Sequence, residues 1–451
     1  MKRIKSLLVP FTLWYLRTIG RLALSRTRAT VIGIAGSVGK TSTREALFAI
    51  LKDIAPTHMV SGNSETGVPL GLVGLFPRDY SPFDWAQMMI TAPFRIRFLK
   101  HMRYIIVEMG IDDPYPPKNM AYLLTIVKPD IGIITEESAA HTMQFEKIFG
   151  PNVVVSDSER LKLLIEAITK EDAKMVKQDR CTLGVINGDN RFLVDGFKGS
   201  KKNILTFGST SGCSIRSTEY AVDTKKTTFS YELHNEIKES ITLTFKGFAF
   251  PRELTYVFAP VILTAYKLTI PLDTIKANLE KNFTPPKGRE GLFEGINNSV
   301  IIDSSYNASK PSVISFLELV EQLKKETKRH TVVILADMLE LGNESQIEHE
   351  AVARAIGNIP DTLYLIGPLT KRFILPIVKE AKWFPSIIEL NQALSDIPNR
   401  SLILFKGSQG NLWLEESIKL LLKNKEDVSR LCRQNAFWQR VKKAAGRWVE
   451  I

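Results

Sequence analysis

The stretch that decides the fold is residues 31–43, Val-Ile-Gly-Ile-Ala-Gly-Ser-Val-Gly-Lys-Thr-Ser-Thr. An apolar run typical of a buried strand comes first, a glycine-bearing turn follows, and Gly-Lys-Thr opens a helix-forming segment. A strand, turn and helix in this order aim backbone N–H groups and the positive end of the helix dipole at a phosphate group. The pattern predicts a nucleotide-binding phosphate loop with the contacts Gly36, Ser37, Gly39, Lys40, Thr41 and Ser42.

Each residue type in this loop has a physical task. Lys40 supplies a positive charge for the phosphates, and the Thr41 hydroxyl is suited to Mg²⁺. Gly36 and Gly39 keep side chains out of the way. The longer phosphate-loop pattern has a glycine five residues before Gly39, where this chain has Ile34, so the loop is the shorter G-x-x-G-K-T form.

Composition narrows the class of protein. A chain of 451 residues with 24% charged and 44% hydrophobic residues is expected to form two or three soluble globular domains. The three cysteines, Cys181, Cys213 and Cys432, are far apart in the sequence. Such spacing argues for a reducing, cytoplasmic location and against a zinc site or a disulfide framework.

The net charge of +12 is concentrated at the two ends of the chain. Residues 1–28 hold seven basic residues and no acid, and residues 423–451 hold eight basic residues against three acids. The remainder is close to neutral, which disfavours a broad nucleic-acid surface.

Both ends also contain apolar and aromatic residues. The apolar run within residues 1–28 is interrupted by Arg17 and Arg21, so it is too short to span a membrane. We predict an amphipathic helix that either lies at a membrane surface or packs on the domain behind it. The tail, residues 424–451, has the same two interpretations.

Polar side chains follow several strand-like segments. Residues 104–108 end in Glu108, residues 130–135 precede His141, and residues 185–187 end in Asn187. Ligands of open α/β sheets lie at the carboxyl ends of the strands, where a nucleotide would sit. From position alone, Glu108 could equally be a solvent-facing charge and His141 a structural histidine.

The second half of the chain changes character twice. Residues 203–248 read as antiparallel strands, and residues 285–288 read as a hinge. From residue 299 strands and helices alternate, which predicts a doubly wound domain. The predicted helices and strands of this part are 299–303, 313–325, 331–336, 347–356, 362–366, 371–381, 401–405 and 412–422.

Many short blocks of the sequence resemble one family, the Mur ligases, and within it the branch that joins D-alanyl-D-alanine to UDP-N-acetylmuramoyl-tripeptide. Their order and spacing extend over roughly residues 29–422. The blocks are 36–42 (GSVGKTS), 63–70 (NSETGVPL), 108–110 (EMG), 140–141 (AH), 187–189 (NGD), 288–289 (GR), 303–309 (DSSYNAS), 336–342 (ADMLELG), 349 (H) and 406–408 (KGS).

The resemblance implies an α/β fold with a P-loop central ATPase domain built on a parallel sheet and a C-terminal Rossmann-like doubly wound domain. The expected domains are a basic amphipathic segment (1–28), the ATP-binding domain (29–284), the C-terminal domain (285–423) and a basic tail (424–451). The implied reaction is ATP-dependent amide formation: a substrate carboxylate attacks the γ-phosphate, and an amine then displaces phosphate from the acyl phosphate.

The same resemblance assigns roles to residues, with ATP and Mg²⁺ as cofactors. Thr41 and Glu108 would hold one Mg²⁺ and His141 a second. The residues expected to contact the nucleotide or reacting centre are Asn187, Arg289, Asp303, Asn307 and Lys406. Asp337 and Glu340 match a family block that either serves catalysis or fixes its own turn.

Three features depart from the family pattern. Members usually carry an N-terminal domain that binds the UDP-sugar, and only residues 1–28 precede this domain here, so the acceptor carboxylate is left open. Residues 135–138 are Thr-Glu-Glu-Ser where Thr-Asn-Ile-Gly is common, which adds acid near the metal region. A carbamylated lysine often binds metal in the family; Lys162 is the nearest candidate, and a solvated helix lysine is the competing interpretation.

Three other functions remain to be weighed. Poly-γ-glutamate and folylpolyglutamate ligases are related enzymes without the UDP-binding domain. A non-catalytic nucleotide-binding subunit would show degraded phosphate-loop residues, and a nucleic-acid binder would mix basic and aromatic residues through the body. We expect a monomeric cytoplasmic ligase without nucleic-acid partners, with the two termini as candidates for contact with the inner face of the membrane.

Overall fold

The computed structural model describes residues 2–77, 81–136, 145–149, 157–234, 238–339, 341–408, 410 and 412–449. The chain forms two compact units. The first contains residues 1–219, 230–243 and 254–283, and the second contains residues 220–229, 244–253 and 284–451. The α/β fold class expected from the sequence is confirmed, and the predicted domain boundaries stay predictions.

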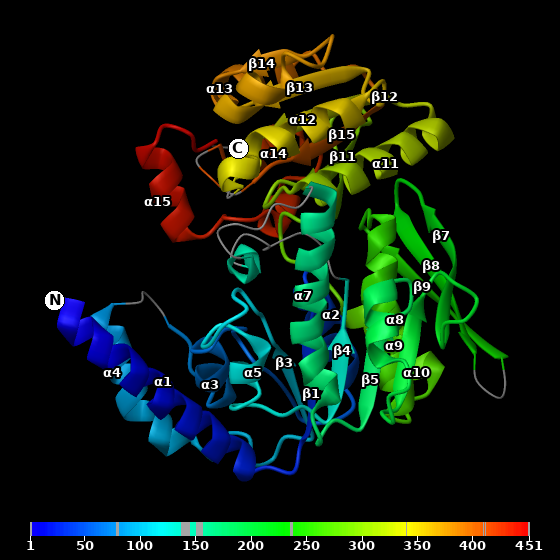
Figure 1. The fold of residues 1–451 in the computed structure, drawn as a ribbon. Coiled ribbons are helices and arrows are strands. Elements are labelled where there is room, and N and C mark those ends of the chain that lie inside the picture. Colours follow the sequence, from blue (N-terminus) through cyan, green and yellow to red (C-terminus); the bar gives the residue numbers. More distant parts are fainter. Residues whose placement is uncertain are drawn as a thin grey trace. The chain divides into compact units, whose positions relative to one another are not determined.

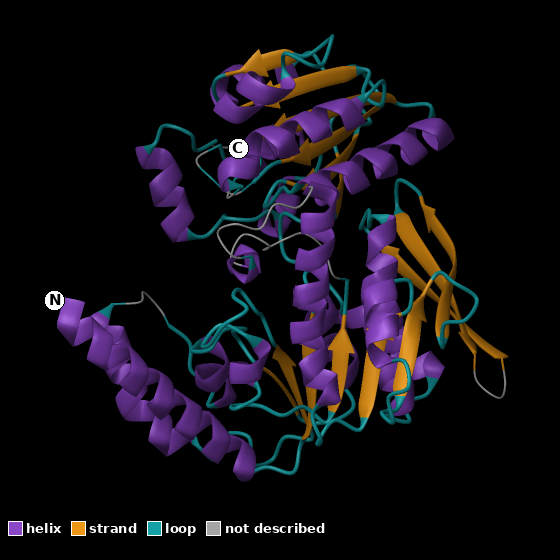
Figure 2. Ribbon diagram, viewed as in Figure 1, coloured by secondary structure: helices purple, strands orange, loops and turns teal. Residues whose placement is uncertain are grey.

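The first sheet has the strand order β2-β3-β1-β4-β5-β6-β7-β8-β9 (Figures 1 and 2). Its pairs from β2 to β7 are parallel. The strands are β1 (Thr30–Ala35), β2 (Thr57–Met59), β3 (Tyr104–Glu108), β4 (Ile131–Ile134), β5 (Leu183–Asn187), β6 (Ile204–Gly208), β7 (Ile215–Val222), β8 (Lys226–His234) and β9 (Lys238–Lys246).

Helices lie in the connections between the successive parallel strands from β1 to β6, as the crossover rule requires, and other helices of this part of the chain precede β1 or follow β9. They are α1 (Lys2–Ser25), α2 (Lys40–Leu51), α3 (Gly67–Leu72), α4 (Pro82–Thr91), η1 (Ala92–Arg95), α5 (Met120–Leu123), η2 (Glu146–Ile148), α7 (Asp157–Lys177), α8 (Arg191–Phe197), η3 (Arg252–Leu254), α9 (Thr255–Lys267) and α10 (Leu272–Asn282). Strands β1, β3 and β4 deliver the phosphate loop, Glu108 and the 135–136 segment to one edge of the sheet.

A row of three glycines lets helix α7 approach the sheet. Gly33, Gly132 and Gly184 are in register on the neighbouring strands β1, β4 and β5. A Cβ atom on Gly132 would lie 2.8 Å from Val176 Cγ2, and one on Gly184 would lie 2.6 Å from Val176 Cγ1. The absence of side chains in this row therefore sets the position of α7.

Helix α1 is two-faced. Leu16, Ile19 and Ala23 are buried, while Phe11 and Trp14 are exposed. The helix thus packs on the unit behind it, one of the two predicted alternatives. Among the described helices, none is both long and apolar enough to cross a bilayer.

The second sheet has the order β10-β11-β15-β12-β13-β14. The β10–β11 pair is antiparallel and the others are parallel. The elements of this unit are β10 (Gly291–Glu294), β11 (Val300–Ser304), α11 (Lys310–Thr327), β12 (His330–Ala336), η4 (Gly342–Glu344), α12 (Ser345–Ile356), β13 (Thr362–Ile366), η5 (Thr370–Ile374), β14 (Lys382–Phe384), α13 (Ile387–Leu394), β15 (Ser401–Lys406), α14 (Glu415–Leu421), η6 (Lys425–Arg430) and α15 (Ala436–Ala444).

One predicted helix of this unit is wrong. Residues 371–381 form only the short helical turn η5, followed by the strand β14, and helix α13 comes later. Pro376 explains the difference, because proline lacks the N–H that an α-helix needs at that position and clashes with the preceding turn.

The C-terminal tail docks on its own unit. Helix α15 places Lys442 at 0% exposure, where its Nζ lies 2.7 Å from the carboxylates of both Glu415 and Glu416. Lys419 pairs with Glu416 and lies 3.4 Å from the centre of the Trp448 ring. The docked interpretation of the tail is the one observed.

Candidate active site

The phosphate loop joins β1 to α2 in a tight turn. Gly36 has φ +125° and Gly39 has φ +85°, so both adopt backbone conformations that strain other residues. The N–H groups of Ser37 and Val38 donate to the backbone oxygen of Glu136 at 2.9 and 3.1 Å. The loop is therefore held against the chain that follows β4.

Lys40 opens helix α2 and bends back over the loop. Its Nζ donates to the backbone oxygens of Gly36 and Ser37. The ammonium group consequently lies at the mouth of the loop, where a phosphate would be bound in a structure of this type.

Glu108 is the centre of the polar network beside the loop. Its side chain is almost fully buried, and Thr41 Oγ1 donates to its Oε2 at 3.0 Å. Asn63 Nδ2 donates to Oε1 at 3.2 Å, and Arg44 Nη1 lies 3.4 Å from Oε2. The sequence singled out Thr41 and Glu108, and the structure brings them together. Asn63 appeared only within a motif block, and Arg44 was missed.

The donor set around Glu108 fits a hard cation. Mg²⁺ prefers oxygen ligands and is commonly held by one or two protein groups together with phosphate oxygens and waters. Thr41 and Glu108 offer such oxygens 3.0 Å apart. Within the described part of the chain, no group of three or more His, Cys, Asp or Glu side chains is arranged to hold a metal alone.

Two other predicted metal ligands have different outcomes. His141 lies outside the described residues, as does Glu340. Lys162 lies on helix α7 with an exposed side chain. No assignment of either as a ligand follows from the described residues.

Asn187 ends β5 and is nearly fully buried. Its side-chain amide donates to the Glu136 carboxylate. Glu136 belongs to the segment that departs from the family pattern, and its backbone also anchors the phosphate loop. Because of this departure, the carboxylate of Glu136 contacts Asn187, a residue predicted to contact the nucleotide.

A further polar cluster in this unit was not predicted. The Asp189 carboxylate accepts hydrogen bonds from the N–H and Oγ of Ser209 at 2.7 and 2.9 Å and from Tyr256 Oη at 2.9 Å. Burial raises the pKa of Asp189, but these hydrogen bonds outweigh it and leave the pKa below its ordinary value. Burial and the bond to Asp189 raise the pKa of Tyr256 to about 12. The 187–189 motif could have pointed to Asp189, whereas Tyr256 has no sequence signal.

In the second unit, Asp303 is the penultimate residue of β11, and Lys406 is the last residue of the neighbouring strand β15. Burial raises the pKa of Asp303 to about 6. Its Oδ1 accepts from the Ser305 N–H at 3.0 Å, while Oδ2 is buried without a hydrogen-bond partner among the described residues. Burial lowers the pKa of Lys406 to about 7, and the Glu290 carboxylate opposes that shift. A buried carboxylate oxygen with no partner is a group that a ligand could satisfy.

The remaining predicted residues of this unit lie nearby in sequence but differ in exposure. Asn307 is exposed, and its backbone oxygen accepts from Lys406 Nζ. The Arg289 guanidinium lies 5.5 Å from the centre of the Tyr306 ring. Burial raises the pKa of Glu290, which the sequence did not single out, to about 7.

The 336–342 block has a structural task in this unit. The Asp337 carboxylate accepts from the N–H groups of Leu369 and Thr370 at 3.0 and 2.8 Å. His349 is fully buried and accepts from the Met338 N–H at 3.1 Å. For Asp337, these contacts favour the turn-fixing interpretation over the catalytic one.

Comparison with known proteins gives concordant results. Residues 288–409 match the family model for the Mur ligase, glutamate ligase domain. The UDP-N-acetylmuramoyl-tripeptide–D-alanyl-D-alanine ligase of Rickettsia prowazekii is 28% identical over 389 residues, covering 85% of this chain and 76% of that protein.

Solved structures share the fold. The MurF ligase from Thermotoga maritima in complex with ADP has a TM-score of 0.69 at 20% identity, covering 92% of this chain and 84% of its own. The folylpolyglutamate synthase of L. casei in its apo form has a TM-score of 0.56 at 16% identity, covering 90% and 94%.

The predicted resemblance to the Mur ligases is confirmed: residues 288–409 match the model of the Mur ligase, glutamate ligase domain, and the chain shares the fold of solved Mur ligases. Within the family, it is similar to the UDP-N-acetylmuramoyl-tripeptide–D-alanyl-D-alanine ligases.

Proposed function

We propose that this chain is an ATP-dependent ligase that joins an amino acid or dipeptide, such as D-alanyl-D-alanine, to the carboxylate of a cell-wall precursor. The observation that carries the proposal is the contact between Thr41 and Glu108 beside the Lys40 phosphate loop. The similarity to ligases named for UDP-N-acetylmuramoyl-tripeptide and D-alanyl-D-alanine supports that choice of substrates.

The reaction follows from the chemistry of the substrates. A carboxylate oxygen of the acceptor attacks the γ-phosphorus of ATP, forming an acyl phosphate and releasing ADP. The amine nitrogen then attacks the acyl carbon, loses a proton and expels inorganic phosphate. Positioning and charge neutralisation dominate such phosphoryl transfer.

In the first unit, each residue has a task in this scheme. Lys40 neutralises phosphate charge, and the loop residues Gly36, Ser37, Gly39 and Ser42 bring their backbone close to the phosphates. Thr41 and Glu108 would hold Mg²⁺, with His141 as the proposed ligand of a second ion. Bound Mg²⁺ would supply charge neutralisation at the phosphate oxygens.

Residues of the second unit are proposed to serve the same reaction. Lys406, whose pKa of about 7 allows it to exchange a proton near neutral pH, would act at the reacting centre. Asp303 has an unsatisfied buried oxygen for a ligand hydroxyl. Arg289 and Asn307 are proposed as nucleotide contacts of this unit, as Asn187 is proposed for the first unit. Lys162 stays a candidate only if it is carbamylated.

We further propose that the protein acts as a cytoplasmic monomer and contacts the membrane surface through helix α1. The C-terminal tail is less suited to that task, because its Lys442 is buried in ion pairs. The basic residues of α1 and the exposed Phe11 and Trp14 support the proposal for the N-terminal end.

The test is Mg²⁺-dependent release of phosphate from ATP, with UDP-N-acetylmuramoyl-tripeptide and D-alanyl-D-alanine added singly and together. We expect release only with both. Lys40→Ala should lower the rate by roughly 10²- to 10³-fold, the effect of removing one preorganised charge-stabilising group. Lys52→Ala, at the C-cap of the same helix and thus at the end away from the phosphate loop, is the matched control and should leave the rate unchanged.

Two outcomes would contradict the proposal. Failure to bind ATP would remove the enzyme function and leave only a structural role for the phosphate loop. Binding of ATP without phosphate release on addition of the two wall substrates would also contradict it. Release with folate and glutamate instead would then favour a folylpolyglutamate-type ligase, and no release with either pair would favour a non-catalytic nucleotide-binding subunit. The folylpolyglutamate synthase structure is the weaker match, with a TM-score of 0.56 against 0.69.

A further inference from the structure

Exposed apolar side chains gather on two helical segments of the first unit. Helix α1 exposes Phe11, Trp14 and Leu22, spaced so that they share one helix face. The segment α4–η1 exposes Phe83, Ile90 and Phe94, with Phe83 at 80% and Phe94 at 86% exposure. Soluble proteins rarely expose several large aromatic side chains close together, and such patches usually mark an interaction surface.

The two segments form one surface. Tyr15 Oη of α1 donates to the Met89 backbone oxygen of α4 at 2.6 Å. Leu16, Leu70 and Met88 are buried together between the helices and α3. Figure 1 shows α1 and α4 side by side. We use the name α1–α4 face for these exposed apolar residues together with a set of basic residues close to them in the sequence. The apolar residues are Phe11, Trp14, Leu22, Phe83, Ile90 and Phe94, and the basic residues are Arg17, Arg21, Arg26, Arg28, Lys100, His101 and Arg103.

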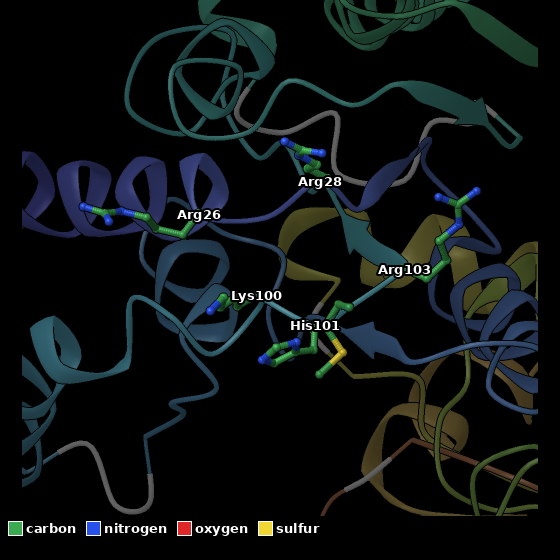
Figure 3. A pocket seen from close by; sticks show the side chains of 6 residues that line it. Arg26, Arg28, Lys100, His101 and Arg103 are labelled. Carbon is green, nitrogen blue, oxygen red and sulfur yellow. The ribbon is translucent and has the colours of Figure 1, made fainter.

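The charge of this face has one sign. Residues 9–28 contain Arg17, Arg21, Arg26 and Arg28 and no acid. The only acid in residues 81–103 is Asp84, which is buried. A pocket of about 380 Å³ is lined by Arg26, Arg28, Lys100, His101, Met102 and Arg103 (Figure 3). These groups attract anions, phosphate groups in particular.

We propose that the α1–α4 face docks on a bilayer surface that contains anionic phospholipids. Aromatic residues lie at the headgroup level of such a surface, arginines and lysines pair with lipid phosphates, and the two contributions add. The basic pocket takes a lipid phosphate at the edge of the face. Docking is peripheral, since none of the described helices is suited to cross the bilayer.

This inference deepens the membrane contact proposed above and rests on it, but not on the ligase chemistry. None of the residues of the α1–α4 face belongs to the proposed catalytic or binding machinery. Loss of docking and loss of activity can therefore be measured separately on the same protein.

The experiment is co-sedimentation of the full chain with vesicles of phosphatidylcholine alone or with roughly 30 mol% phosphatidylglycerol, because basic residues are attracted to anionic lipids. We expect binding to the anionic vesicles only, weakened in high salt. Phe83→Ser with Phe94→Ser, and Arg26→Gln with Lys100→Gln, should each weaken binding by roughly tenfold or more.

Matched controls change exposed residues elsewhere. Ile347→Ser with Ile388→Ser removes two exposed apolar side chains of the second unit. Lys225→Gln with Lys226→Gln removes two exposed charges, one from the turn before β8 and one from the first residue of β8. Both should bind anionic vesicles as the unaltered chain does.

Several results would overturn the inference. These are no binding to anionic vesicles, equal binding to neutral ones, controls that weaken binding as much as the face variants, or a dimer in solution that Phe83→Ser with Phe94→Ser dissociates. Thermal unfolding and phosphate release by the same variants are expected to be unchanged. Release of phosphate without vesicle binding overturns docking alone, and vesicle binding without release overturns the ligase proposal alone.

Discussion

The two basic ends of the chain have similar composition but opposite packing. In the tail, Lys442 and Arg433 form buried ion pairs with Glu415, and Trp448 covers Lys419. In helix α1, Phe11, Trp14 and Arg21 remain exposed while only the opposite face is buried.

This difference in burial is explained by the residues that each end packs against rather than by the composition of the ends. Helix α14 begins with Glu415 and Glu416, both buried, and these acids accept the charges of the tail. The segment α4–η1, which flanks α1, is mostly apolar and aromatic, and its one acid, Asp84, is buried. The basic side chains of an amphipathic helix are buried where the fold supplies acids, and they stay exposed to an external anion where it does not.

The largest expected effect comes from breaking the tail's charge cluster. Lys442→Met should lower the free energy of unfolding by about 3–4 kcal/mol, because it leaves Glu415 and Glu416 buried with one cation fewer. Urea unfolding of the full chain measures it. Arg21→Met, the matched change in α1, should cost less than about 0.5 kcal/mol. Equal effects at the two ends would contradict the comparison.

Helix α1 should show a two-faced response. Leu16→Ala removes a fully buried side chain and should cost about 2–3 kcal/mol, since the edge of the unit can partly collapse into the space. Phe11→Ala on the exposed face should change stability by less than about 0.5 kcal/mol. The same urea titration distinguishes them, and a large loss from Phe11→Ala would mean that this face is already covered.

The tail's aromatic contact should have a smaller effect. The Lys419 ammonium group lies 3.4 Å from the centre of the Trp448 ring. Trp448→Leu keeps apolar bulk but removes the cation–π attraction, so we expect a loss of about 1–2 kcal/mol in thermal or urea unfolding. Trp448→Phe should restore part of it, and failure to do so would point to packing alone.

The smallest expected effect is a pH dependence of the free energy of unfolding, which arises where the tail contacts Glu416 of helix α14. Burial raises the pKa of Glu416, but hydrogen bonds from Lys419, Lys442 and the Val449 N–H outweigh it and lower the pKa. A lowered folded pKa gives stability above the unfolded value, and that stability is lost as the pH falls through the folded pKa. The stability difference between the unaltered chain and Glu416→Gln should therefore shrink below about pH 4. An unchanged difference would contradict the ion-pair description.

Much of the fold could be predicted because its signals are local. The phosphate-loop pattern at Gly36–Thr41 and the strand–helix alternation after residue 299 are readable from neighbouring residues. The prediction of a helix over residues 371–381 was wrong because it followed the apolar pattern and gave no weight to Pro376. The glycine row of Gly33, Gly132 and Gly184 could not be read, since only strand pairing brings distant residues into register.

The candidate site divides in the same way. Thr41 and Glu108 stand at ends of predictable elements, so their proximity followed from the parallel sheet. No sequence motif marks three other residues of the site, because packing between distant segments determines their positions. These residues are Arg44, Tyr256 and Glu290. Their burial and hydrogen bonds depend on residues far away in the sequence.

The sequence by itself determined the phosphate loop, the α/β class, the resemblance to the Mur ligases and the position of charge at both ends, because these depend on residue type and short spacing. Only the tertiary structure decided which end is neutralised by buried acids and which exposes aromatic and basic groups. The physical reason is that a side chain's charge is local, whereas its desolvation and its partners are set by segments that meet only when the chain has folded.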